Sequence, residues 1–360
     1  MIAYLTKQFQ AVPALMAIYR EIGGHFVTTR SNTVKAIKQY NPQASVIKYT
    51  EKLGRFSSGY KTLDKADVIL TGGPYRNILS QFNARKYMIF TGTTPALTAL
   101  DIRENHAHFD RLCAIGPRML RTIEKSGVNV EVMQTGYFPF LNFPERDNEK
   151  RKALLESVEL DGGRRNVVYL PRGKPNGSFD LMMPNFLQGM PGADFNFIVR
   201  PHPSQSVKLH LRDRLLFMAM QKEVRRHKNV YLDLNYFRLS DLLSMADLVI
   251  TDGNSPAEES LFYDTPQILV ETERLSRKSI SSAMRKNAAS DEDIELALRI
   301  YDNGPIITPG DKDLNSLIER AMADASQYAA ARSANFEFVF GERDFKRQHA
   351  LIDELRSYTS

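Results

Sequence analysis

The sequence is poor in several features, and each shortage excludes a class of protein. One of its 360 residues is cysteine and none is tryptophan. A single thiol, Cys113, forms neither an intramolecular disulfide nor a cysteine-based zinc cluster, which suits a reducing compartment. No run approaches the roughly 18 apolar residues of a membrane-spanning helix, and the start of the chain lacks the apolar core of a signal peptide. We therefore expect a cytoplasmic protein.

The sequence also lacks a large excess of charged residues of either sign. The chain has 48 basic and 42 acidic residues, which gives a net charge of +6. This excess favours phosphate-bearing ligands or an anionic membrane surface. The sequence has no concentrated stripe of lysine and arginine with interleaved aromatic residues, so we do not expect a nucleic-acid partner. The basic segment 208–228 predicts a helix that either lies on an anionic membrane or simply faces solvent.

What the sequence does have is an alternation of short apolar runs and helical patterns. Residues 2–5 predict a buried strand, residues 11–22 an amphipathic helix, and residues 25–29 the next strand. The alternation stops in the charged segment 143–165 and restarts at Val167. Strands that alternate with helices and end in glycine or proline are typical of open parallel sheets, which bind ligands at the carboxyl ends of their strands.

This pattern predicts an α/β protein with two Rossmann-like lobes and a cleft between them. A chain of 360 residues is long enough for two domains of ordinary size. We expect the first lobe at residues 1–145, the second at 146–335, and a C-terminal segment at 336–360 that carries a closing helix. A cleft between lobes is the usual place for a substrate site.

The second lobe contains a strand, turn and helix pattern that is typical of an anion site. Residues 248–250 form an apolar run, Asp252-Gly253-Asn254-Ser255-Pro256 is turn chemistry, and a helical pattern continues through Glu259. Backbone N–H groups and the positive helix end would point at a ligand above the strand, with Asn254 and Ser255 as further donors. An ordinary connection capped by one of these two side chains is the alternative.

Two other strand-end loops of this lobe carry basic residues. In Arg200-Pro201-His202-Pro203 the prolines fix the backbone just past a strand, so Arg200 and His202 are held at the ligand edge. The guanidinium matches phosphate oxygens, and the imidazole can donate a hydrogen bond or a proton to a leaving phosphate. Arg172 and Lys174 follow an earlier strand in the same way. A structural histidine, a surface ion pair and a solvated turn are the alternatives.

The first lobe offers fewer chemical groups. A loop at Thr91-Gly92-Thr93-Thr94-Pro95 follows a strand, and His106 and His108 come shortly after Asp101 and Glu104. An imidazole beside a carboxylate can take a proton from a hydroxyl, although such a pair on a polar helix is often exposed and inert. No spacing in the chain matches a metal site or a Gly-x-Ser-x-Gly nucleophile elbow, so we predict no metal.

In this order, the motifs resemble those of the CDP-glycerol glycerophosphotransferases of teichoic acid and capsule assembly. The matching stretches, which cover the second half of the chain well and the first half loosely, are residues 148–170, Arg200-Pro201-His202-Pro203, residues 241–255, Gly304-Pro305-Ile306-Ile307 and residues 341–355.

That resemblance implies a GT-B fold whose first lobe binds the acceptor and whose second lobe binds the CDP-linked donor. It also implies that Arg200 and His202 meet the diphosphate of the donor. The other donor-binding residues that we predict are Arg172, Lys174, Thr251, Asp252, Asn254, Ser255 and Glu259. The predicted acceptor loop is Thr91, Gly92, Thr93 and Thr94.

One loop departs from the pattern of that family. A His-Gly-Thr-Pro loop usually supplies the base that activates the acceptor hydroxyl, whereas this chain has Gly92-Thr93-Thr94-Pro95. Either another group, such as His106, His108, Asp101 or His25, is the base, or the reaction differs. Residues 251–259 and 269–274 also resemble the UDP-N-acetylglucosamine 2-epimerases, which share the two-lobed fold.

The sequence thus predicts a transferase that moves glycerol phosphate from CDP-glycerol to a hydroxyl of a glycan or lipid-linked acceptor. The donor is a substrate, and no cofactor is expected. Peripheral contact with the inner face of the membrane would place the protein beside a lipid-linked acceptor. The alternatives are a GT-B glycosyltransferase with a nucleotide-sugar donor, an enzyme like the 2-epimerases, and a non-catalytic nucleotide-binding module.

Overall fold

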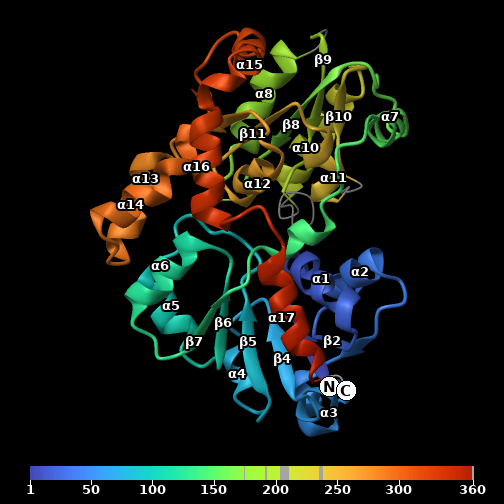
Figure 1. Ribbon diagram of the computed structural model, residues 1–360. Helices are drawn as coiled ribbons and strands as arrows, with labels where there is room; N and C mark the ends of the chain where they lie inside the picture. Colours follow the sequence, from blue (N-terminus) through green and yellow to red (C-terminus); the bar gives the residue numbers. More distant parts are fainter. Residues whose placement is uncertain (174, 191–192, 203–210, 235–237, 359–360) are drawn as a thin grey trace. The chain divides into compact units, whose positions relative to one another are not determined.

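The computed structural model describes residues 1–360 apart from 174, 191–192, 203–210, 235–237 and 359–360 (Figure 1). The chain forms two compact units. Unit 1 comprises Met1–Asn142, Asn287–Ala289 and Glu337–Ser360, and unit 2 comprises Phe143–Lys286 and Ser290–Phe336. The charged segment that the sequence suggested as a link belongs to unit 2, where Asn148–Glu156 forms helix α7.

Unit 1 is built on a seven-stranded sheet in which all neighbouring strands are parallel, in the order β3-β2-β1-β4-β5-β6-β7. The strands are β1 (Ile2–Leu5), β2 (His25–Thr28), β3 (Val46–Lys48), β4 (Val68–Thr71), β5 (Arg85–Ile89), β6 (Arg111–Ala114) and β7 (Glu131–Gln134). The strand order reverses between β1 and β4, which makes their carboxyl ends a topological switch point.

The helices of unit 1 connect these strands. They are α1 (Val12–Ile22), α2 (Ser31–Tyr40), α3 (Ser58–Asp64), α4 (Arg76–Leu79), α5 (Ala99–His106) and α6 (Pro117–Ser126), with the 3-10 segments η1 (Phe9–Ala11), η2 (Glu51–Phe56) and η3 (Phe138–Asn142). Helix α17 (Lys346–Arg356) returns to pack on α1, and its Leu351, Ile352 and Leu355 are fully buried. The C-terminal segment is therefore part of the core of unit 1.

Unit 2 repeats the design with a six-stranded parallel sheet in the order β10-β9-β8-β11-β12-β13. The strands are β8 (Arg165–Leu170), β9 (Phe195–Val199), β10 (Val230–Leu232), β11 (Leu248–Thr251), β12 (Gln267–Val270) and β13 (Ile306–Ile307). The switch point lies between β8 and β11, where Leu170 is the register partner of Thr251. The loops after these two strands therefore begin at the same level of the sheet.

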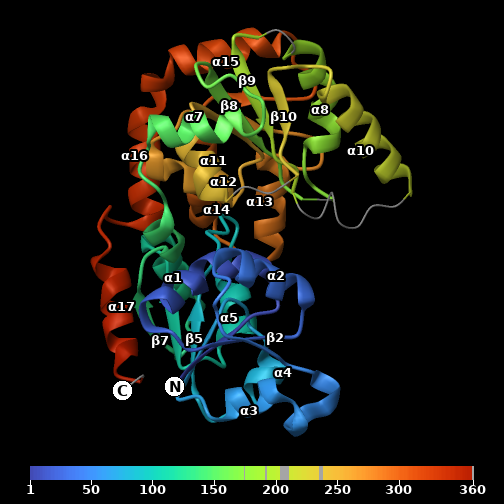
Figure 2. The same ribbon diagram turned by 90° about the vertical axis from the view of Figure 1, so that its right-hand side faces the viewer.

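Helices and 3-10 segments cover both faces of this second sheet. They are α8 (Phe179–Gly189), α10 (Leu211–Val224), α11 (Leu239–Met245), α12 (Ser255–Glu259), η4 (Ser260–Tyr263), α13 (Arg277–Lys286), α14 (Asp291–Leu298), η5 (Arg299–Asn303), α15 (Leu314–Ala323), η6 (Ala325–Tyr328) and α16 (Ala329–Phe340), which contains the boundary between the units. Figure 2 shows α8 and α10 on one side of strands β8 to β10 and α7 and α11 on the other.

The strands of unit 2 are apolar on both faces because both faces are covered. Val167 and Tyr169 of β8 pack into a cluster with residues of α8 and α15, while Val168 and Leu170 pack against α7 and α11. This explains why the sequence shows continuous apolar runs instead of alternation. In unit 1, Cys113 lies in the core, where burial raises the pKa of its thiol, so it is an inert packing residue.

None of the helices in the described ranges is long and apolar enough to cross a membrane.

Candidate functional site

The loops after β8 and β11 are joined at the switch point of unit 2 by one buried carboxylate. Asp252 accepts the backbone N–H of Arg172 at 2.7 Å, the backbone N–H of Ser178 at 2.9 Å, and the hydroxyl of Ser178. The Ser178 hydroxyl in turn lies 2.5 Å from the hydroxyl of Tyr169 in β8. Both oxygens of Asp252, which the sequence predicts to line the donor site, hold one loop to the other.

Burial also changes the acidity of this carboxyl group. Desolvation raises the pKa of Asp252 to about 6, although hydrogen bonds from Ser178 and Arg172 and the positive charge of Arg172 act in the opposite direction. The charged form is therefore costly at neutral pH and is stabilised by those contacts. Asp252 is thus a link between the two loops that changes with its protonation state.

Three basic residues gather at the same edge of the sheet. The backbone N–H of Arg200 donates to the carbonyl of Tyr169 at 3.0 Å, which sets the loop after β9 beside the end of β8. The pKa of His202 is lowered first by burial and then by the positive charges of Arg172 and Arg200. These charges act on His202 because the three groups lie near one another. The result is a neutral imidazole next to two guanidinium groups.

Arg172 is the most available of the three groups. Its side chain is exposed, and its guanidinium makes no ion pair or hydrogen bond to any described residue. Lys174 and Pro203, which the sequence placed in the same loops, lie outside the described residues. Two guanidinium groups and an imidazole at strand ends can bind the oxygens of a diphosphate.

The turn after β11 uses its polar side chains locally. Thr251 is fully buried, and its hydroxyl donates to the side-chain oxygen of Asn254 at 2.7 Å. Neither Asn254 nor Ser255 caps α12 with a side chain, so the predicted capping alternative is absent. Gly253 has a positive φ of 65°, the left-handed region that glycine adopts without strain. Glu259, a predicted donor-binding residue, is buried in α12.

The predicted acceptor loop lies at the carboxyl edge of the unit 1 sheet. Thr93 is buried, and its carbonyl accepts a hydrogen bond from Arg118 of α6 at 2.9 Å. Thr94 has a positive φ of 41°, which is unfavourable for a β-branched residue. A Cβ at Gly72, in the loop after β4, would lie 2.9 Å from the methyl group of Thr91. The loops after β4 and β5 are thus packed closely together.

Three of the four groups that could replace the missing loop histidine do not fit that role. His106 is only 7% exposed and packs between Phe90 and Phe109, with ring centroids 5.3 and 6.1 Å away. Burial lowers its pKa, and as a core histidine it cannot meet an acceptor. Asp101 forms a capping box with Thr98 at the start of α5. The burial of His106 between two phenylalanines corrects the prediction that this residue is catalytic.

His25 begins β2, so it lies at the amino edge of the sheet, away from the strand-end loops, and its Nδ1 is 2.7 Å from the hydroxyl of Ser45. His108 lies in the connection from α5 to β6, so its backbone is also near the amino edge of the sheet, but its side chain reaches the segment after β4. Its Nε2 donates to the carbonyl of Pro74, in the segment after β4, at 2.6 Å. Burial and the charges of Arg76 and Lys86 lower the pKa of His108 despite this bond. The ring is therefore neutral at pH 7 with an unprotonated Nδ1.

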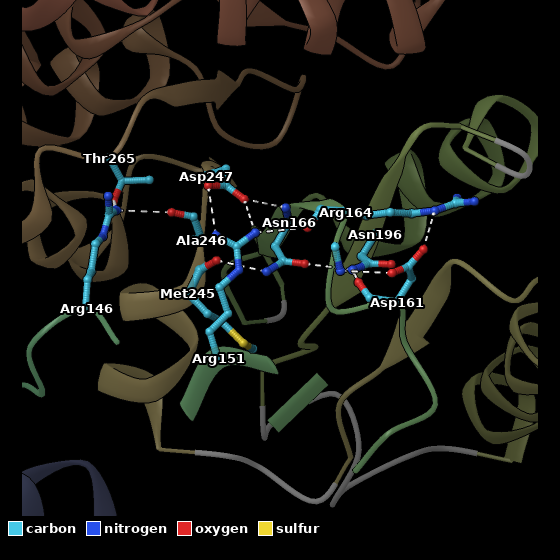
Figure 3. Close-up of polar contacts among 11 residues, drawn as sticks. Arg146, Arg151, Asp161, Arg164, Asn166, Asn196, Met245, Ala246, Asp247 and Thr265 are labelled. Atoms are coloured by element: carbon cyan, nitrogen blue, oxygen red, sulfur yellow. Dashed lines mark hydrogen bonds and ion pairs between the residues drawn. The ribbon is translucent and has the colours of Figure 1, made fainter. Parts of the chain in front are cut away.

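The opposite edge of the unit 2 sheet shows what a purely structural polar cluster looks like (Figure 3). Arg151 of α7 pairs with Asp247 at 2.7 Å, and Asp247 accepts the backbone N–H of Asn166 at the start of β8 at 2.7 Å. The side chain of Asn166 donates to the carbonyl of Met245 and accepts from Asn196. These residues join α7, β8, β9 and the segment before β11 through one another.

The described residues contain no group of three or more His, Cys, Asp or Glu side chains that could hold a metal ion.

Sequence comparison finds no relative. No protein-family model matches the chain, and no curated protein matches it.

Solved structures do resemble it over its whole length. The wall teichoic acid polymerase TagF, in a structure with CDPG, has 14% sequence identity and a TM-score of 0.68, with 100% of this chain and 88% of that chain covered. Anabaena HepE in complex with UDP-glucose has 13% identity and a TM-score of 0.58, with 99% of each chain covered. HepE in complex with UDP and glucose has 12% identity and a TM-score of 0.59, again over 99% of each chain. The predicted fold class is thereby confirmed: the chain has two Rossmann-like lobes of the GT-B type.

Proposed function

We propose that this protein is a transferase that uses a nucleotide-diphosphate donor, and that the donor is CDP-glycerol. It would transfer glycerol phosphate to a hydroxyl of a glycan or lipid-linked acceptor in the synthesis of a capsule or a teichoic acid-like polymer. The gathering of Arg172, Arg200 and His202 at the switch point of unit 2 carries the proposal. Two further facts support it, namely the motif order in the sequence and the likeness of the fold to TagF and HepE.

In this proposal the acceptor oxygen attacks the phosphorus that bears glycerol, the bond from that phosphorus to the CMP oxygen breaks, and the acceptor loses its proton. Arg172 and Arg200 offset the negative charge that develops on departing CMP. His202 is neutral at pH 7 before the donor binds and can hydrogen-bond its phosphates; a nearby dianion would raise its pKa and let it donate a proton. These groups supply the electrostatic stabilisation, so the proposal includes no cofactor besides the donor substrate.

We assign the acceptor-activating base to His108. The bond from Nε2 to Pro74 fixes the tautomer, and the lowered pKa keeps Nδ1 unprotonated and able to accept a proton. A positioned general base contributes typically 10²- to 10⁴-fold to a rate, so His108→Gln should lower kcat by about that factor and leave donor affinity unchanged. Steady-state rates of CMP release, with donor affinity measured in parallel, check this prediction. A variant with parental kcat would remove His108 from the mechanism.

A titration of four donors tests the donor assignment. Purified protein is titrated with CDP-glycerol, CDP-ribitol, UDP-N-acetylglucosamine and GDP-mannose, and the titration is repeated with Arg200→Ala and His202→Ala. Arg285→Ala, which removes an exposed guanidinium paired with Asp291, is the control. Selective binding of CDP-glycerol that both site variants lose and the control keeps is the expected result. A preference for a UDP- or GDP-linked sugar would contradict it.

The likeness to HepE favours a second candidate, a glycosyltransferase with a nucleotide-sugar donor. The same site serves both reactions, because both donors carry a diphosphate. The products separate them, since sugar transfer releases UDP or GDP and glycerol phosphate transfer releases CMP. Binding of CDP-glycerol without release of CMP for any acceptor would indicate the non-catalytic module instead.

Peripheral contact with an anionic membrane is also part of the proposal. The sequence predicts such a contact for the basic segment that contains α10. In this helix, Leu215 and Met218 are exposed, three residues apart on one face. A second surface, which the sequence did not reveal, is η2 of unit 1. There Phe56 is 87% and Leu53 is 55% exposed, beside Lys52 and Arg55, which are exposed and have no ion pair among the described residues. Bare apolar side chains next to unpaired cations match the interface of a bilayer.

Sedimentation with vesicles tests these two surfaces. We expect the protein to sediment with vesicles that contain anionic lipid and to remain in solution with neutral ones. The double variant Leu53→Ser/Phe56→Ser should lose most of this binding, and Leu215→Ser/Met218→Ser reports the share of α10. If the parent shows no dependence on anionic lipid, the membrane contact is ruled out.

A further inference from the structure

Tyr301 in η5 has a buried hydroxyl that contacts no hydrogen-bonding partner among the described residues. The residue is only 4% exposed, so water does not compensate for the missing bond. Other deeply buried tyrosines do have partners: Tyr4 donates to the carbonyl of Gly23 at 2.9 Å, Tyr87 to Glu354 at 3.1 Å, and Tyr169 lies 2.5 Å from Ser178. An unpaired buried hydroxyl is costly and calls for an explanation.

The position of the Tyr301 hydroxyl suggests an explanation for its missing hydrogen bond. A Cβ built on Gly253 would lie 3.3 Å from both Cζ and the hydroxyl oxygen of Tyr301, so the end of the ring rests against the turn after β11. The guanidinium of Arg277 lies 5.9 Å from the ring centroid and is held at 2.8 Å by Glu271, which follows β12. The hydroxyl end of the Tyr301 ring therefore lies against the turn after β11, next to the basic cluster, although η5 itself precedes β13.

Within the chain, the groups near Tyr301 are already engaged. Asp252 accepts its hydrogen bonds from the loop after β8, and Glu271 accepts both the backbone N–H and the side chain of Arg277. Burial first, and then the negative charges of Glu271 and Asp252, raise the pKa of the Tyr301 phenol and keep it protonated, while the positive charges of Arg277 and Arg172 lower this pKa. Tyr301 is thus a hydrogen-bond donor at an edge where the basic residues would bring an anionic ligand.

We propose that the hydroxyl of Tyr301 is a donor-binding group that donates a hydrogen bond to a phosphate oxygen of the bound nucleotide diphosphate. The inference rests on the proposed function and deepens it. Because the hydroxyl is buried beneath Gly253, the contact forms when the turn after β11 shifts. Gly253 places no side chain between the hydroxyl and that turn, and its positive φ is one that glycine adopts without strain.

The test compares two substitutions that each remove a single hydroxyl. Tyr301→Phe should bind CDP and CDP-glycerol about 10- to 100-fold more weakly, the range expected for a hydrogen bond to a charged group. Binding of cytidine, which has no phosphate, should not change. Without ligand the variant should unfold at the same or a higher temperature, because it loses an unpaired polar group. Calorimetric titration and thermal unfolding give these values.

Tyr263→Phe is the matched control, because the hydroxyl of Tyr263 donates to the carbonyl of Pro144 at 2.5 Å. It should lower the unfolding temperature and leave the affinity for CDP and CDP-glycerol unchanged. Three results for Tyr301→Phe overturn the inference: unchanged affinity for both diphosphates, an equal loss for cytidine, or a lower unfolding temperature with weaker binding of every ligand.

The parent protein separates this inference from the proposed function. If the parent binds a nucleotide diphosphate and Tyr301→Phe binds it equally well, only the Tyr301 contact is wrong. If the parent binds no nucleotide diphosphate at all, the proposed function is wrong and the contact is wrong with it.

Discussion

The two edges of the unit 2 sheet carry charged residues of the same kinds and use them differently. At the amino edge, Arg151 and Asp247 pair with each other and with the backbone at the start of β8 (Figure 3). At the carboxyl edge, Arg172 is exposed without an ion pair to a described residue, and His202 lies beside two arginines. A charge whose partner is in the chain holds the fold, whereas like charges gathered at strand ends suit an anionic ligand.

Asp252 sharpens this comparison, because it lies at the carboxyl edge and yet its partners are in the chain. Its pKa is raised from 3.8 to about 6, so the native state binds a proton more tightly than the unfolded state. This tighter proton binding stabilises the folded state by on the order of 3 kcal/mol for a shift of this size. The stabilisation is fully present below about pH 4 and is lost as the pH rises to about 6.

Asp252→Asn cannot titrate, so the difference in unfolding free energy between parent and variant should change between pH 4 and pH 6 and be constant above pH 7. Urea unfolding at several pH values measures it. A difference that is the same at pH 4 and pH 7 would show that the carboxyl group titrates normally in the native state.

The amino edge should respond to substitution in stability alone. Asp247→Ala removes the ion pair with Arg151 and leaves the backbone N–H of Asn166 without its acceptor. We expect the free energy of unfolding to fall by about 2–3 kcal/mol, with donor affinity unchanged. Asp291→Ala, which breaks an exposed pair with Arg285, is the control and should cost under about 1 kcal/mol. Weaker donor binding by folded Asp247→Ala would contradict the assignment.

The carboxyl edge should respond in the opposite way. Arg172→Ala leaves the backbone bond from residue 172 to Asp252 intact and removes only an exposed guanidinium. Donor affinity should fall about tenfold, as expected for the loss of one charge-assisted contact, while the unfolding temperature stays within about a degree of the parent value. Calorimetric titration and thermal unfolding of the same preparation check both parts. A destabilised variant with parental affinity would place Arg172 with the structural residues.

The sequence predicts the elements better than the roles of individual side chains. Apolar runs and turn residues predict the strands and the strand-end loops, because both signals are local. The sheet then brings the loops at Arg172, Arg200 and Asp252 together, as parallel topology requires. This part of the site follows from the order of strands alone.

Burial of single residues could not be predicted in the same way, because it depends on contacts distant in the chain. His106 and His108 are two residues apart, and only the packing of Phe90 and Phe109 decides that His106 is a core residue. Tyr301 is far from Gly253 in sequence, and no motif marks it. Gly253, two residues past the end of β11, was the one available signal, since a glycine at such a place indicates that another group approaches the backbone closely.

The most direct test of the central claim is the pKa of His202, measured by NMR with and without CDP-glycerol and assigned by comparison with His202→Ala. Burial and two neighbouring arginines lower this pKa in the free protein. A diphosphate bound at Arg172 and Arg200 brings negative charge to the imidazole, so saturating donor should raise the pKa. A His202 pKa that donor binding leaves unchanged would show that the phosphates bind elsewhere.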